Sequence, residues 1–253
     1  MPGISVVIIT LNEERNIGRC LDSVRDIADE IIVVDSFSTD RTEEICKQKG
    51  ARFIQHKFED YVKQHVYADR LVTQDYILSL DADEALSVEL QKSIGEVKKN
   101  FVTDAYTMNR MTNYCGQWIK HCGWYPDKKL RLYHKNAGEW SGIKIHESFL
   151  LKEGVSIKHL QGDILHFSFY NISEHINQAN KFTDITAQVA YDKGKKASNL
   201  KIFFSPIAKF IRDYFFNLGF LDGFNGFLIC QISANATFLK YVKLKELHLK
   251  KPK

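Results

Sequence analysis

The sequence predicts an α/β domain with a mixed, mainly parallel sheet and helices on both faces, followed by a helical C-terminal extension. The first observation is a set of short strand-like runs, the first of which is apolar throughout, as expected of a strand covered on both faces. The second is their alternation with helical patterns, which is typical of βαβ units. The third is a change to helical periodicity after about residue 171. The short runs are residues 4–10, 30–35, 51–56 and 76–80.

The elements follow one another at the spacing that βαβ units require. The first run, ISVVIIT, is rich in β-branched residues, which favour strands. Asn12 and the acidic residues after it open a helix, in which Ile17, Leu21 and Val24 share one face at i, i+4 and i+7. The second run, EIIVVD, leads through SFSTD into another helix that carries Ile45. ARFIQH and DYILSL supply the third and fourth strands.

The composition is that of an ordinary soluble globular protein. The chain has 253 residues, of which 44% are hydrophobic and 26% charged. Its five cysteines include no CxxC pair, so we expect reduced thiols in a cytoplasmic protein and neither a disulfide framework nor a structural zinc site. The first strand begins almost at once, without a preceding basic segment, and we therefore expect no secretory signal.

Charge is distributed unevenly along the chain. The net charge of +4 is too small to indicate nucleic-acid binding, and we expect none. From Lys193 onward, however, twelve Lys/Arg face three Asp/Glu, so this tail carries +9 while the rest is net acidic. This asymmetry indicates an anionic partner, and a membrane surface is one candidate.

The same tail is rich in phenylalanine. Charged residues interrupt residues 202–239, so we expect no spanning helix. A Phe-rich face flanked by Lys/Arg is typical of an interfacial segment on an anionic bilayer. The alternative is that the aromatics pack on the α/β domain as a lid and the lysines form a solvated face.

Polar clusters follow three of the predicted strands. In parallel α/β sheets, ligands bind at the carboxyl ends of the strands. Asp and Ser are common turn residues, so any one cluster alone is weak support for a site. Three clusters after three strands of one sheet are stronger support. They are Thr10-Leu11-Asn12-Glu13, Asp35-Ser36 and Asp81-Ala82-Asp83-Glu84.

Asp81-Ala82-Asp83 places two carboxylates at one sheet edge. Mg²⁺ or Mn²⁺ bridging to a diphosphate relieves such a concentration of charge. The alternative is a helix N-terminus, with Asp83 and Glu84 stabilising the dipole of a helix that starts near Ser87. Phosphatases with an aspartyl nucleophile are disfavoured, because they need Thr or Val where Ala85 stands and carry the motif on their first strand.

These segments resemble a known family. ISVVIITLNEERNIGRCLDSV, DEIIVVDSFSTDRT and YILSLDADE are similar to the N-terminal half of family 2 glycosyltransferases, which have the Rossmann-like GT-A fold. GWYPDKKLRLY, KIHE, LHFSF, GFLDGFNGF and FLKYVKL resemble the bacterial lipopolysaccharide-core subgroup that includes heptose β-1,4-glucosyltransferases. The resemblance implies a nucleotide-sugar-binding half in residues 1–100, an acceptor-binding and catalytic half of the same domain in 101–170, and a helical, basic and aromatic region in 171–253.

The resemblance also implies roles for individual residues. Glu147 would be the catalytic base, and Asp83 with His166 would bind Mg²⁺ or Mn²⁺. Where the subgroup has a Gln-Lys/Arg-Asn triplet, this chain has Gln64-His65-Val66, so an imidazole replaces a fixed cation. The acceptor-binding residues would be Trp124, Asp127 (a second candidate base) and Arg131. The nucleotide-sugar-binding residues would be Thr10, Leu11, Asn12, Glu13, Asp35, Ser36, Gln64, Asp81, Ala82 and Asp83.

We therefore expect an inverting glycosyltransferase that moves a hexose, glucose from UDP-glucose, to a lipid-linked saccharide such as the lipopolysaccharide inner core. One base and no partner nucleophile indicate a single displacement, hence inversion. We expect a cytoplasmic protein, peripheral on the inner face of the cytoplasmic membrane. A nucleotidyltransferase is one alternative, although TLNEERN lacks the Gly-rich loop that it needs. A non-catalytic carbohydrate-binding relative is the other, and the His65-Val66 departure leaves it open.

Overall fold

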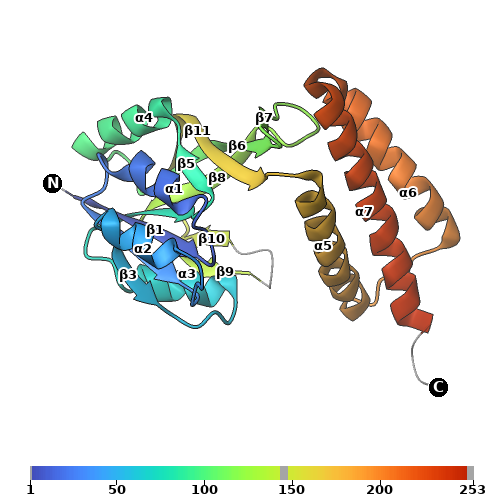
Figure 1. Cartoon of the computed structure of the whole chain (residues 1–253), viewed down its shortest axis with the longest axis horizontal. Coiled ribbons are helices and arrows are strands. Elements are labelled where there is room, and N and C mark those ends of the chain that lie inside the picture. The colour runs from blue at the N-terminus through green and yellow to red at the C-terminus, as the bar shows by residue number, and fades with distance from the viewer. Residues whose placement is uncertain (1, 143–147, 250–253) are drawn as a thin grey trace. The chain divides into compact units, whose positions relative to one another are not determined.

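The computed structural model describes residues 2–142 and 148–249 (Figure 1). It divides into two compact units. The first comprises Met1–Arg110 and Asp127–Phe167, and the second Met111–Pro126 and Ser168–Lys253. Residues 101–110 and 127–167 thus belong with the N-terminal hundred residues, whereas residues 111–126 belong with the C-terminal helices.

The first unit is built on a mixed sheet with the strand order β3-β2-β1-β4-β8-β6-β11-β5, and β7 pairs with β6. β1 runs parallel to β2 and β4, and β2 runs parallel to β3, which confirms the predicted parallel half. β8 is antiparallel to β4 and β6, and β11 is antiparallel to β5. β6 and β11 continue into the second unit. The strands are β1 (Ile4–Thr10), β2 (Glu30–Asp35), β3 (Arg52–Gln55), β4 (Tyr76–Asp81), β5 (Glu84–Leu86), β6 (Ala105–Tyr114), β7 (Gln117–Trp118), β8 (Asp127–His134) and β11 (Ile157–Phe169).

Helices cover both faces of this sheet, as predicted. Successive side chains of a strand point to opposite faces, and in β1 Val6 and Val7 accordingly belong to two different buried clusters. The Val6 cluster includes residues of three helices, α1 (Ile17–Val24), α2 (Thr42–Gln48) and α4 (Val88–Lys99). The Val7 cluster includes Ala68 of α3 (Tyr61–Asp69), and side chains of the two-stranded sheet β9 (Gly138–Ser141) and β10 (Ser148–Leu151) pack against it.

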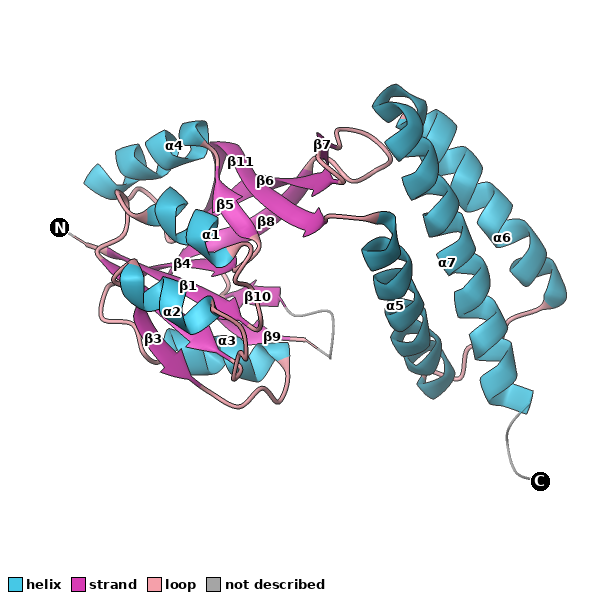
Figure 2. Ribbon diagram, in the orientation of Figure 1, coloured by secondary structure: helices cyan, strands magenta, loops and turns pink. Residues whose placement is uncertain are grey.

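The second unit is mainly helical, which confirms the predicted helical extension. Its long helix α7 packs against both α5 and α6 (Figure 2). Asn171 caps α5 by accepting a hydrogen bond from the backbone N–H of Glu174, which satisfies a free amide of the first turn. The Glu174 side chain accepts a second bond from the N–H of Tyr170, just before the cap. The elements are α5 (Ile172–Asp192), α6 (Asn199–Ile211), the π-helix η1 (Arg212–Phe216), the 3₁₀-helix η2 (Gly219–Asp222) and α7 (Gly223–Leu249).

Close packing of two glycines explains part of the GFLDGFNGF segment. A Cβ atom on Gly226 would lie 1.9 Å from the carbonyl oxygen of Gly219, so only glycine fits. The buried Asp222 accepts hydrogen bonds from the backbone N–H of His121 (2.8 Å) and contacts its Nδ1 at 2.9 Å. These contacts hold the 115–126 segment against the start of α7.

Among the helices that the structure describes, no single one is long and apolar enough to cross a membrane. Taken together, Asn199–Phe216 and Gly219–Leu249 meet that requirement in length and composition, but the two segments are bent by 71° at their junction.

Candidate functional site

The three polar clusters that follow β1, β2 and β4 lie at one edge of the sheet. Thr10 of β1 is in register with Asp35 of β2, and Ile9 is in register with Asp81 of β4. Because all three strands are parallel, their carboxyl ends meet there. The structure thus brings the clusters together as the sequence predicted.

The loops after β1 and β2 are bonded to each other. Asn12 has a left-handed backbone (φ 54°), which asparagine tolerates better than most residues. Its backbone N–H donates to Ser38 Oγ (2.7 Å), and its Oδ1 accepts from the N–H of Thr39 (2.8 Å). Ser38 in turn donates both its N–H (2.8 Å) and its hydroxyl to the fully buried Asp35 carboxylate. Ser38 and Thr39 therefore fix the shape of this edge, a role that the sequence did not reveal.

Glu13 lies beside the other acidic groups of the site. Burial raises its pKa to about 7; a hydrogen bond from Asn16 opposes the rise, and the charges of Asp83, Asp40 and Asp81 add to it. Its backbone N–H donates to Thr42 Oγ1 (2.8 Å), which ties the loop to α2. The Glu13 carboxyl therefore takes up a proton more readily than an ordinary glutamate.

Gln64 and Thr10 offer polar groups at the same edge. The buried Gln64 of α3 donates to Ser36 Oγ (3.2 Å), and its Oε1 lies 2.9 Å from His56 Nδ1. Thr10 Oγ1 is buried and has no hydrogen-bond partner among the described residues. A buried hydroxyl without a partner is costly, and a bound ligand would relieve this cost. Leu11 is exposed, whereas Ala82 is buried.

Asp81 belongs to an ion-pair network centred on the buried side chains of Arg131 and Glu84. Arg131 Nη2 donates to Asp81 (2.7 Å) and to Glu84 (2.9 Å), whose side chain is completely buried. Burial would raise the pKa of Asp81, but Arg131 outweighs it and lowers that pKa to about 2. Arg110 extends the network from Glu84 (3.2 Å) to Asp127 (2.9 Å). Arg131, predicted to bind the acceptor, thus holds Asp81 in place.

Asp83 lies next to His166, the two residues predicted to bind a metal. β5 pairs with β11 so that Glu84 is opposite His166, and this brings His166 Nε2 within 3.2 Å of Asp83 Oδ2. α4 begins only at Val88, with Ser87 as its cap. This agrees with the predicted helix start near Ser87, but Asp83 is paired with His166 and Glu84 with Arg131, and β5 separates both carboxylates from the helix terminus. The structure therefore favours a role for these carboxylates in the site over the helix-terminus alternative. No group of three or more His, Cys, Asp or Glu side chains suited to a metal occurs within the described ranges.

His65 is buried and stacks on Trp140, with ring centroids 3.9 Å apart. Burial lowers its pKa to about 4; Asp81 opposes and Arg131 reinforces this shift. The imidazole is therefore neutral near pH 7 and supplies no cation. Trp140 Nε1 donates to Asp69 (3.0 Å), whose pKa burial raises to about 6 although this bond and one from Tyr133 lower it.

Two further predicted residues are Trp124 and Glu147. Trp124 is part of an aromatic cluster in the second unit, with Tyr114, Phe169 and His175. Glu147, the predicted base, is outside the described residues. The sequence did not predict that Glu84 and Arg110 take part in the ion-pair network. Glu84 does, however, belong to the predicted polar cluster after the fourth strand. Nothing in AYTMNRMTNY distinguishes Arg110 from a solvated strand residue.

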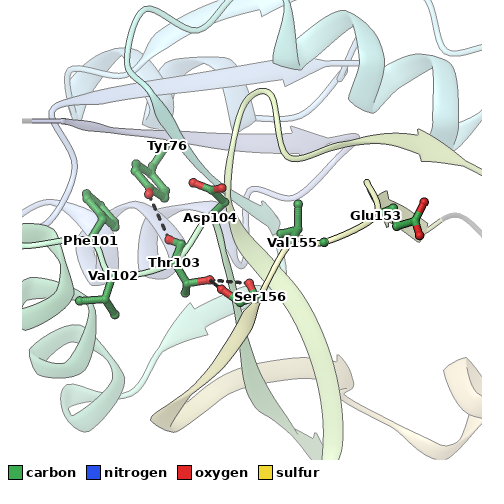
Figure 3. A pocket seen from close by; sticks show the side chains of 9 residues that line it. Tyr76, Phe101, Val102, Thr103, Asp104, Glu153, Val155 and Ser156 are labelled. Atoms are coloured by element: carbon green, nitrogen blue, oxygen red, sulfur yellow. Dashed lines mark hydrogen bonds between the residues drawn. The ribbon is translucent and has the colours of Figure 1, made fainter.

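A separate pocket of about 460 Å³ lies at the opposite end of β4 (Figure 3). It is lined by Tyr76, by residues 101–104 and by residues 153–156. Tyr76 begins β4 and Asp81 ends it. The pocket is therefore distinct from the polar edge. Some of its groups bond to one another: Tyr76 OH donates to the Thr103 carbonyl (3.0 Å), and Thr103 Oγ1 bonds Ser156.

Comparison with known proteins agrees with this geometry. The model of glycosyl transferase family 2 matches residues 5–159, and the chain belongs to that family, which confirms the GT-A fold class. It is 35% identical to an uncharacterized glycosyltransferase of Rickettsia typhi, over 99% of this chain and 89% of the relative. It is 28% identical to the lipopolysaccharide core biosynthesis glycosyltransferase LpsC of Rhizobium meliloti, over 97% of this chain and 93% of the relative.

Solved structures are also similar. One is glucosyl-3-phosphoglycerate synthase from Mycobacterium tuberculosis in complex with Mn²⁺, UDP-glucose and phosphoglyceric acid. It is 19% identical with a TM-score of 0.39, and the match covers 54% of this chain and 57% of that one.

Proposed function

We propose that the chain is an inverting hexosyltransferase that moves glucose from UDP-glucose to a saccharide of a lipid-linked glycan. The convergence of Thr10, Asn12, Asp35, Asp81 and Asp83 at one sheet edge carries the proposal. Membership of family 2 makes the protein a glycosyltransferase. The LpsC relative supports the lipopolysaccharide core as the acceptor class, and such an acceptor would place the reaction at the inner face of the cytoplasmic membrane.

In this proposal, the loops after β1 and β2 hold the nucleoside. Asp35 and the Thr10 hydroxyl, which has no partner among the residues the structure describes, are buried groups that can bond the base or ribose. Asp81 is kept ionised by Arg131. An ionised carboxylate is a strong acceptor for sugar or ribose hydroxyls. Buried polar groups of this kind fix the orientation of a ligand, because any of them left without a hydrogen bond costs free energy.

Asp83 and His166 fit a divalent cation. Their 3.2 Å separation is compatible with one ion, because neighbouring ligands of a six-coordinate ion lie about 3 Å apart. A hard cation with few protein ligands takes its remaining oxygens from phosphates and water. Bound there, Mg²⁺ or Mn²⁺ would neutralise charge on the diphosphate leaving group.

Glu147 is proposed as the base that takes the proton of the acceptor hydroxyl. The test measures glucose release from UDP-glucose and transfer to core saccharides. Wild type is expected to turn over, and Glu147→Gln to bind donor equally while turnover falls by about two orders of magnitude or more. Asp127→Asn is the matched control, expected to retain most activity.

Equal turnover in Glu147→Gln would refute Glu147 as the base. Loss of turnover only in Asp127→Asn would move the role to Asp127. Donor binding without any turnover in wild type would favour the non-catalytic alternative. Neither binding nor hydrolysis of any nucleotide-sugar with Mn²⁺ or Mg²⁺ would refute the proposal as a whole.

A further inference from the structure

Helix α6 exposes an unusually apolar face. Its exposed residues Leu200, Phe203, Phe204, Ile207 and Ile211 are spaced i, i+3, i+4, i+7 and i+11, so they form one stripe along the helix. α6 has no buried residue, and Leu200 and Phe203 are 70% and 64% exposed. In a soluble monomer, such a continuous apolar surface marks a site of contact.

Further exposed apolar residues follow α6 in the chain. Phe215 and Phe216 of η1, Phe220 and Leu221 of η2, and Phe224 at the start of α7 are all exposed, Phe216 by 78%. They lie at the bend between α6 and α7, where the chain turns by 71°. We call the α6 stripe and these five residues the apolar face of the second unit.

The charges beside this face are mainly positive. Lys193, Lys195 and Lys196 in the α5–α6 connection and Lys201 in the first turn of α6 are all exposed. The nearby acids of η1 and η2, Asp213 and Asp222, are instead buried. Two copies facing each other through this surface would bring like charges together, whereas anionic headgroups would be attracted.

We infer that the apolar face docks on an anionic lipid bilayer, with α6 lying in the plane of the interface. Thirteen residues span about 20 Å as a helix, which is shorter than the hydrocarbon core. Aromatic and aliphatic side chains enter the headgroup boundary, and the lysines bind headgroup phosphates. The inference deepens the proposed function, since a lipid-linked acceptor is met at such a surface, but the exposed side chains carry it.

The test is co-sedimentation of the full chain with vesicles containing phosphatidylglycerol, compared with phosphatidylcholine alone. Wild type is expected to bind the anionic vesicles, and less at high salt. Replacing Lys193, Lys195 and Lys196 with Gln should weaken binding on the order of a hundredfold, since each lysine contributes about fivefold. Phe203→Ser with Phe204→Ser should weaken it at least about tenfold.

The matched control replaces Ile176 and Phe182 of α5 with Ser, because these are exposed apolar residues outside the face. It should bind vesicles as wild type does. The inference is overturned if wild type does not bind vesicles. It is also overturned if the Phe203/Phe204 variant binds them as tightly as the Ile176/Phe182 control. It is also overturned if wild type forms dimers that the Phe203/Phe204 variant abolishes while vesicles stay unbound. Resistance to an alkaline carbonate wash would contradict the in-plane orientation.

Donor chemistry is measured separately, as hydrolysis of UDP-glucose without vesicles. The Phe203/Phe204 variant is expected to hydrolyse donor at the wild-type rate and to keep its unfolding temperature. Vesicle binding without hydrolysis by wild type would refute the proposed function and leave the docking surface standing, whereas hydrolysis without vesicle binding would do the reverse.

Discussion

Replacing Arg131 with Met tests the buried ion-pair network beneath Asp81. Arg131 bonds two carboxylates, and the Glu84 side chain is completely inaccessible. Removing one partner of a buried pair costs about 3–5 kcal/mol. Because Arg110 still contacts Glu84 at 3.2 Å, we expect the lower end, a loss of about 3 kcal/mol in the free energy of unfolding. That corresponds to a fall of about 6–12 °C in unfolding temperature.

Urea denaturation followed by circular dichroism measures this loss, with Arg110→Met as the matched control at about 1 kcal/mol. The double variant Arg131→Met/Glu84→Met leaves neither charge buried alone, so it should recover most of the stability. A loss below about 1 kcal/mol in Arg131→Met would refute the reasoning, since it would mean that Glu84 is solvated or neutral. Strict additivity in the double variant would also refute it.

Three further predictions concern the pH dependence, the glycine packing and the donor site. Because burial raises the pKa of Asp69 to about 6, the protonated side chain stabilises the fold below about pH 4, and this stabilisation is lost as the pH rises through about 6. The free energy of unfolding of wild type minus that of Asp69→Asn should therefore fall by about 2–3 kcal/mol between pH 4 and 7. A difference that does not change with pH would contradict the raised pKa. Gly226→Ala should lower the free energy of unfolding by about 2–3 kcal/mol, because the added Cβ clashes with the carbonyl oxygen of Gly219. Gly95→Ala, with open space around it, should raise the free energy of unfolding by up to about 1 kcal/mol. Similar shifts in the unfolding temperatures of both variants would contradict the packing. Thr10→Val removes the buried hydroxyl and should stabilise the free protein by about 1 kcal/mol. It should also weaken UDP-glucose binding about fivefold, measured by calorimetry. Unchanged affinity would show that Thr10 is not part of the donor site.

The N-terminal half of the fold could be predicted because its information is local. The predicted strands at residues 4–10 and 30–35 match β1 and β2 residue for residue, and β4 extends the predicted 76–80 run only to Asp81. The parallel arrangement follows from the intervening helices, so the convergence of Asp35 and Asp81 near Thr10 could be expected from their places after the strands.

The second half could not be predicted in the same way. β6 and β11 mix polar and apolar residues without a clean period, and their partners lie far away in sequence. The Arg131–Glu84 bond joins residues 47 positions apart, which no local pattern encodes. The pairing of His166 with Asp83 was reached only through the family resemblance. The burial of His65 against Trp140 depends on a tertiary contact between α3 and β9.

Calorimetric titration of UDP-glucose with and without Mn²⁺ tests the central claim most directly, that the carboxyl end of β4 holds a metal-bound nucleotide-sugar. We predict Mn²⁺-dependent binding that weakens at least about tenfold in Asp83→Asn, through loss of the carboxylate ligand. Asp104→Asn, the same change in the pocket at the other end of β4, should bind as wild type does. Binding that neither EDTA nor Asp83→Asn alters would contradict the claim.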